Sequence, residues 1–365
     1  MTDLSAASSA FGVEPLPVSG RNSDEHSAQA EARRLARHCM AYRDALDGRA
    51  AFQLASTLGL YLALCAALLW AASEGWWGLL PLLALPAGGL LVRLFTIQHD
   101  CGHGSFFTGR AVNTALGRAL SVLTLTPYGF WRRAHTLHHA SAGDLSRRGI
   151  GDVDTLTVAE YRALSPREGW KYRLYRHPLV LHVLGPPLYF VLFQRSPFGQ
   201  ALPPGACWRS VMSLNLAIVA FYGALMVALG PWIVLAALVP VACIASWVGA
   251  WLFFVQHQFE HTQWDDAKAW DLQAAALGGS SYYVLPPVLQ WFTGNVGLHH
   301  IHHLNSRVPN YRLQECLDGE PTLGTISRLT LGESLRCIGL ALWDEETRRL
   351  IPFSGLDTAP SGSAR

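Results

Sequence analysis

The chain has 365 residues, of which 50% are hydrophobic and 15% are charged. In an average soluble domain roughly 25% of the residues are charged. The composition therefore favours a polytopic membrane protein. The formal net charge of +2 argues against a polyanionic partner and thus against nucleic acid. The seven cysteines are odd in number and contain no C-x-x-C pair, which argues against a disulfide framework.

The first 48 residues lack a long apolar run and cannot be a secretory signal. We interpret residues 1–48 as a tail outside the membrane that is partly disordered. Alanine, arginine and leucine at helical spacing predict a short surface helix between Ser27 and Leu46.

Four apolar segments follow, each of about 20 residues, which is enough for a helix to cross a hydrocarbon core of ~30 Å. Short loops join the first to the second and the third to the fourth. We therefore expect an all-α integral membrane protein whose four transmembrane helices form two hairpins. The predicted helices cover 52–72, 78–97, 211–229 and 233–255.

Shorter apolar segments lie between and after the hairpins. Residues 112–128 and 179–193 are too short or too interrupted to span the bilayer, so we expect them in its interface. Residues 316–365 form a polar C-terminal tail, with one predicted amphipathic helix at 332–350.

Basic residues predict the orientation. Both hairpin loops lack Lys and Arg, whereas the segment 109–209 carries many of them. The positive-inside rule therefore places this segment, both termini and the histidine motifs in the cytoplasm.

Three histidine-rich motifs stand out. Offsets of three and four residues put side chains on one face of a helix, because 3.6 residues make one turn, so each motif can aim its imidazoles at one point. The motifs are H-x-x-x-H at His99 and His103, H-x-x-H-H at His135, His138 and His139, and H-x-x-H-H at His299, His302 and His303.

Eight convergent histidines are too many for one tetrahedral ion and predict two metal ions that share a site. Neutral imidazole suits Zn, Cu, Fe and Ni. Because we expect no thiolate or carboxylate ligand from the motifs, an iron pair that activates O2 is the first choice. His300 lies between the ligand directions and is expected to point away. Cys101, inside the first motif, is expected to be a small filler rather than a ligand.

Other polar residues near the motifs are candidates for parts of the site. Asp144, Asp152 and Asp154 follow the second motif and either orient ligand imidazoles or form turns and helix caps. His177 and His182 stand alone and are expected to be ordinary packed or interfacial histidines.

The histidine motifs resemble those of the integral-membrane fatty acid desaturase and hydroxylase superfamily. Their surroundings are similar to those in bacterial acyl-lipid desaturases of the Δ12 (ω-6) type, through HDCGHGSFF at 99–107, TPY at 126–128, GDVDTLT at 151–157 and GNVGLHHIHHL at 294–304. From this resemblance we expect a membrane desaturase domain at 49–315 and cytosolic tails at 1–48 and 316–365.

The resemblance implies four membrane helices in a bacterial inner membrane, beneath a cytosolic helical cap. It implies a non-haem di-iron centre held by the eight motif histidines. It also implies that O2 and two electrons are consumed to place a cis double bond in the acyl chain of a membrane lipid. No His-Pro-Gly-Gly haem motif occurs in the sequence, so we expect an external electron donor such as ferredoxin.

The family also has a supplementary ligand outside the three motifs. The second and fourth apolar segments end alike, because His99 and His103 follow the second as His257 and His261 follow the fourth. Each pair is expected to lie one helical turn apart. We therefore expect His257 to be the additional ligand, with His261 as the alternative.

Two other functions compete with desaturation. A hydroxylase or ketolase that acts on an alkane, a sphingolipid or a carotenoid would share the histidine motifs. A membrane metal transporter is the second rival, but transport sites place polar residues near the midplane of the bilayer. The histidines of this chain begin where the apolar segments end.

Overall fold

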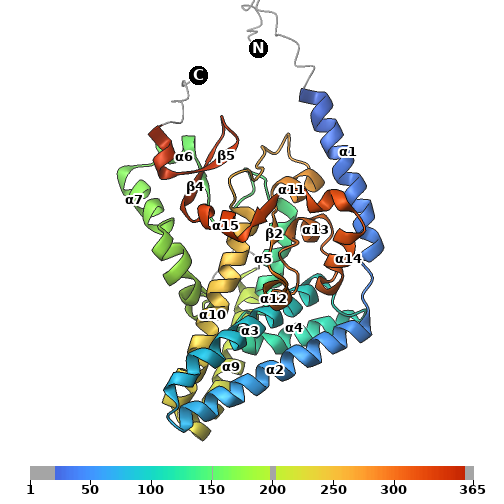
Figure 1. The fold of residues 1–365 in the computed structure, drawn as a ribbon. Coiled ribbons are helices and arrows are strands. Elements are labelled where there is room, and N and C mark those ends of the chain that lie inside the picture. The colour runs from blue at the N-terminus through green and yellow to red at the C-terminus, as the bar shows by residue number, and fades with distance from the viewer. Residues whose placement is uncertain (1–20, 150, 198–202, 358–365) are drawn as a thin grey trace, which may run out of the picture.

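The computed structural model describes residues 21–149, 151–197 and 203–357. The expected disorder of the N-terminal tail therefore falls largely on residues outside the described ranges. Four long helices gather at one end of the molecule, and shorter elements form a cap at the other (Figure 1). The long helices are α2 (Asp47–Ser73), α3 (Leu80–His103), α9 (Pro204–Leu229) and α10 (Pro231–His257).

Each long helix is apolar and long enough to cross a membrane, so the prediction of four such helices in two hairpins is confirmed. Glycines with positive φ make both hairpin turns, Gly75 at 75° and Gly230 at 94°. Pro231 follows Gly230 at the first position of α10, where a missing N–H costs nothing. Side chains on the outer face of the bundle are apolar and exposed, as for Leu216 and Val227 on α9, which fits contact with lipid.

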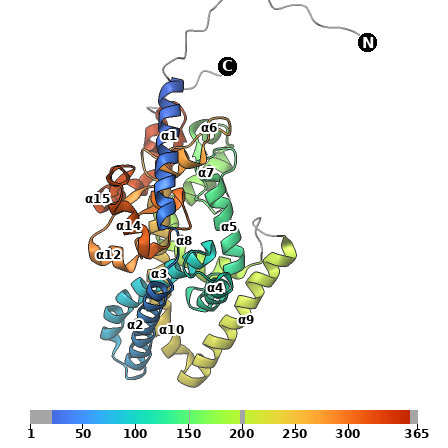
Figure 2. The ribbon, with the colours of Figure 1, turned by 90° about the vertical axis from the view of Figure 1, so that its right-hand side faces the viewer.

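Helix α3 is the centre of the bundle. It packs against α2, α10 and the short helix α4 (Arg110–Thr124), whereas α9 leans away from the other long helices (Figure 2). The approach of α3 to α10 depends on Gly88, because a Cβ there would lie 2.5 Å from Cγ2 of Ile244. Helix α3 continues past the predicted span and ends at His103, so it carries the whole first motif into the cap.

The cap is mainly helical. After α4 come α5 (Tyr128–Ser141), α6 (Val158–Arg162) and α7 (Pro166–Tyr175), and later α11 (Leu272–Gly278), α12 (Pro287–Phe292), α13 (His299–Leu304), α14 (Leu313–Asp318) and α15 (Leu331–Ser334). The predicted segment 179–193 forms an irregular helix from Leu179 to Arg195, in which two π-helical stretches flank the short α8 (Gly185–Pro187).

The predicted N-terminal surface helix is α1 (Arg21–Cys39), which ends at Cys39 rather than at Leu46. It runs along one side of the cap in Figure 1, and Figure 2 views that side with α1 in front. Its buried face, with Ala32, Leu35 and Cys39, packs in one apolar cluster with Ile301 and Cys316. This contact joins the N-terminal helix to the elements that carry and follow the third histidine motif.

Two small sheets complete the cap. In the first, β4 (Leu340–Asp344) lies between β1 (Leu156–Thr157), which is parallel to it, and β5 (Arg349–Pro352), which is antiparallel. In the second, β2 (Tyr282–Val284) pairs in parallel with β3 (Arg328–Thr330).

The prediction of an amphipathic helix at 332–350 is wrong. The helical part ends at Gly339, and the chain continues into β4 and β5. Every residue of β4 is buried, so this run has no polar face that a helix could turn to solvent. The carboxylate of Asp344 accepts hydrogen bonds from the Glu346 N–H and the Thr347 hydroxyl, which form the turn between the strands.

Candidate metal centre

The three histidine motifs meet at the junction between the long helices and the cap. The first motif occupies the last turns of α3, the second lies on α5, and the third forms most of α13. The last residue of α10, His257, reaches the same place. Four elements that are distant in sequence therefore present imidazoles to one another.

The imidazoles form two groups, and within each the candidate ligand atoms all lie within 4.8 Å of one another. Group A contains His99, His103, His135, His139 and His302, and group B contains His138, His257, His299 and His303.

The two H-x-x-H-H motifs each contribute to both groups. His135 and His139, four residues apart, belong to group A, while His138 belongs to group B. The third motif is reversed, because its pair at an offset of four, His299 and His303, is in group B and its middle histidine is in group A. An offset of four residues thus keeps two ligands on one site, and the residue between them points to the other.

The nitrogen–nitrogen distances in group A fit a set of ligands arranged around one metal ion. His135 Nε2 lies 2.9 Å from His99 Nε2, 3.0 Å from His103 Nε2 and 3.1 Å from His139 Nε2. A ring nitrogen carries at most one proton, so hydrogen bonds cannot account for three such contacts. Two nitrogens bound to one ion at about 2.1 Å lie about 3 Å apart when they meet it at a right angle, which fits these separations.

Group B has the same arrangement with one ligand fewer. His257 Nε2 lies 3.1 Å from His138 Nε2 and 3.0 Å from His299 Nε2. His303 Nε2 lies 3.1 Å from His299 Nε2. The donors are ring nitrogens alone, a set that suits first-row transition metals.

Oxygen acceptors behind the rings fix which nitrogen is free. The Nδ1–H of His99 donates to Oδ1 of Asp100 at 3.1 Å, and that of His138 donates to Asp152. The Nδ1–H of His257 donates to the carbonyl oxygen of Gly279 at 2.9 Å. With the proton on Nδ1, the lone pair on Nε2 points into the group and can bind metal.

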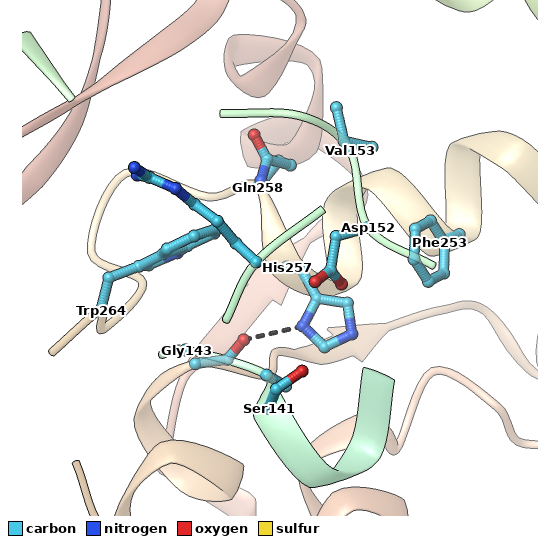
Figure 3. Close-up of a pocket in the computed structure, with 11 residues that line it drawn as sticks. Ser141, Gly143, Asp152, Val153, Phe253, His257, Gln258 and Trp264 are labelled. Atoms are coloured by element: carbon cyan, nitrogen blue, oxygen red, sulfur yellow. Dashed lines mark hydrogen bonds between the residues drawn. The ribbon is translucent and has the colours of Figure 1, made fainter. Parts of the chain in front are cut away.

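A small pocket lies beside group B (Figure 3). Asp152 and His257 face it, and the dashed line there marks the hydrogen bond from His257 to the carbonyl of Gly279. Ser141, Phe253 and other residues complete its wall.

Burial keeps the histidines of the cap in the form that binds metal. The pKa values of His135, His139 and His302 are held well below the usual range, because burial disfavours the imidazolium and the neighbouring histidines repel a further positive charge. A neutral imidazole has a free lone pair, so the electrostatics of the site favour ligation.

The structure brings together all eight motif histidines and His257, but not His261. Helix α10 ends at His257, so His261 does not follow on the same helical face, and it is exposed. The expected one-turn relation between His257 and His261 is therefore wrong. His300 points away, as expected, and its Nε2 donates to the carbonyl oxygen of Leu323 at 3.0 Å. Cys101 is buried and belongs to neither group.

The three aspartates have different surroundings. Asp152 contacts a group B histidine, whereas Asp144 accepts hydrogen bonds from Ser146 and Arg147 in a local turn. Burial and the nearby Asp152 raise the pKa of Asp154.

The sequence analysis did not predict a role for Asp100. Its position next to His99 within the first motif could have indicated the contact with that histidine. The role of the carbonyl of Gly279 was also not predicted, and the sequence carries no signal for it. The isolated His177 and His182 lie outside both groups, and the ring of His182 packs edge-on against Trp251 and Phe254.

Comparison with known proteins gives a consistent result. The family model "Fatty acid desaturase" matches residues 74–321. The chain is 40% identical over 278 residues to a fatty acid desaturase of Bacillus subtilis, which covers 76% of this chain and 78% of the relative.

Two more distant relatives agree. An sn-1 acyl-lipid omega-3 desaturase (ferredoxin) of Synechocystis is 28% identical over 69% of this chain and 70% of its own. A probable fatty acid desaturase of Sorghum bicolor is 27% identical over 71% of this chain and 68% of its own. The protein, with its four apolar helices and paired histidine groups, therefore belongs to the fatty acid desaturase family and is an enzyme of that type.

Proposed function

We propose that the protein is a di-iron membrane desaturase that introduces a cis double bond into the acyl chain of a membrane lipid at the Δ12 (ω-6) position. It consumes O2 and takes electrons from an external carrier of the ferredoxin type. The observation that carries this proposal is the convergence of nine histidine nitrogens into two groups.

Groups A and B would each hold one iron ion, and the residues fit this role because their ring nitrogens converge in two sets at ligand spacing. Iron bound there would supply the O2-dependent oxidation of an unactivated C–H bond, which no side chain can perform. The protein itself keeps the ligands neutral by burial and fixes the rings through Asp100, Asp152 and the carbonyl of Gly279.

An apolar pocket among the long helices suits an acyl chain. Its walls come from α3, α4, α10 and the irregular helix Leu179–Arg195, and Phe95 and Phe190 are among the lining residues. The ring of Phe95 contacts Trp131 at 5.4 Å between centroids. Trp131 in turn stacks on His135 of group A at 4.8 Å. These contacts support entry of the substrate from the bilayer toward group A.

The motif resemblance supports Δ12 regiospecificity, and the names of several relatives support ω-3 as the second candidate. The Synechocystis relative is named as ferredoxin-dependent, which supports a carrier of that class for this chain. We place the protein in a bacterial inner membrane with the histidine groups on the cytosolic side. Cysteine labelling should then find residues 74–76 and 230–231 on the face of the membrane opposite the cytoplasm, and labelling from the cytoplasm would overturn this orientation.

The function is tested by lipid analysis. Expression in a host that makes only monounsaturated lipids should yield diunsaturated acyl chains with a new Δ12 double bond, while His302→Ala should yield none. A new ω-3 double bond would select the second candidate. Hydroxylated products alone would refute desaturation and favour the hydroxylase alternative.

A further inference from the structure

A buried carboxylate links the first histidine motif to the segment that follows the third. Asp100 lies on α3 next to His99 and is 2% exposed. Its Oδ1 accepts a hydrogen bond from Nδ1 of His99 at 3.1 Å. Its Oδ2 accepts two hydrogen bonds from Asn310, at 2.7 Å from the backbone nitrogen and at 2.8 Å from Nδ2. Both oxygens are therefore engaged, one with a group A ligand and one with a distant segment.

The charge of Asp100 is not balanced by a basic side chain. Within the described part of the chain, His99 is its one ion-pair partner, and the Nε2 atom of that histidine faces the other nitrogens of group A. Burying an isolated carboxylate costs several kcal/mol unless a positive charge or strong hydrogen bonds offset it. A cation in group A, on the other side of the His99 ring, would supply that charge.

The contacts of Asn310 extend the link. Its Oδ1 accepts a hydrogen bond from Nε2 of Gln53 on α2 at 2.8 Å, and this pair is buried. Its carbonyl oxygen accepts a hydrogen bond from Nδ2 of Asn295 at 3.0 Å. Asn295 precedes the third motif and Asn310 follows it, so both flanks of α13 are tied to α3 at the position of Asp100.

We propose that Asp100 is a positioning residue that sets the metal affinity of group A and couples the first motif to the third. It holds the His99 ring with Nε2 toward the ion, and it fixes the Asn310 segment that follows the third motif. This inference rests on the proposed function, because it assumes that group A holds iron. Asp152 makes the equivalent contact to His138 in group B.

The test compares Asp100→Asn with Asp144→Asn. Asp144 is a matched control because it is 1% exposed and makes comparable polar contacts but touches neither group. Each purified metal-free protein is titrated with Fe²⁺ without oxygen, against a chelator of known affinity, and the iron environments are resolved by Mössbauer spectroscopy. Thermal unfolding of the metal-free proteins reports stability separately.

Mutation of a residue that hydrogen-bonds a metal ligand from behind lowers metal affinity by about 10- to 100-fold. Asp100→Asn should show this loss in one of two iron sites, while Asp144→Asn binds iron like the wild type even if it is less stable. Asn310→Ala, which keeps the bond between Asp100 and His99, should weaken the same site by a smaller factor. That variant keeps the test decisive if Asp100→Asn does not fold.

Unchanged iron binding in Asp100→Asn, or in Asn310→Ala if that is the variant that folds, would overturn the positioning role. An equal loss of affinity in Asp144→Asn would do the same, since it would show a general effect of stability. A wild-type protein that binds no Fe²⁺ would instead refute the di-iron function on which the inference depends.

Discussion

Replacement of His257 by alanine is the sharpest test of the metal centre. The change reduces group B from four ring nitrogens to three and leaves the five of group A intact. Loss of a residue behind a ligand already costs 10- to 100-fold in metal affinity, so loss of the ligand should cost at least about 100-fold, or about 2.7 kcal/mol. We expect one tightly held iron ion instead of two and no measurable desaturation.

The matched control is His261→Ala, because this residue is exposed and lies outside both groups. It should keep two iron ions and full activity. The pocket beside His257 (Figure 3) offers a further check, since added imidazole could enter the space left by the side chain and restore iron and activity in part. Normal iron content in His257→Ala, or loss of iron in His261→Ala, would refute our assignment of the outlying ligand.

Three other predictions concern protonation, packing and substrate contact. Because burial lowers the pKa values of His135 and His139, the unfolded chain binds protons below about pH 6.5 that the folded chain does not. The free energy of unfolding of the metal-free protein should be level above that pH and fall below it; equal stability at pH 5 and pH 7 in denaturation experiments would contradict this. Gly88→Ala should destabilise the protein by about 1–3 kcal/mol in thermal unfolding, since its Cβ would overlap Ile244, and Ile244→Ala should restore part of the loss. Trp131→Ala should lower kcat/KM while iron content stays at the wild-type level, and a parallel loss of iron would show that the ring only supports His135.

Features encoded by local sequence were the most predictable. Hydropathy over about 20 residues is enough to identify a membrane helix, so the four long helices were expected. Spacing by three and four residues on a helix likewise indicated which histidines converge. It could not indicate that His138 and His302 belong to the opposite group from their neighbours, because this depends on how α5 and α13 face each other.

Features set by distant contacts were not predictable. Helix α10 ends at His257, and the next residue, Gln258, is held by hydrogen bonds to the cap. Its Oε1 accepts from Arg176 and Thr155. The sequence between His257 and His261 contains no residue pattern that indicates the end of a helix. The pairing of Asp100 with Asn310 joins residues that lie far apart in sequence. The strand β4 forms because β1 and β5 flank it, which its own residues do not reveal.

The division of each H-x-x-H-H motif between the two groups has a consequence for assembly. The hairpins α2–α3 and α9–α10 are apolar and have internal hydrogen bonds, so they can insert and pack before any ion arrives. The packing of α5 against α13 is less favourable without ions, because the lone pairs of their histidines then face one another at about 3 Å. We expect the newly made chain to have a formed membrane anchor beneath a folded cap of low stability, which metal binding then stabilises. The supply of metal would then control how much mature enzyme accumulates.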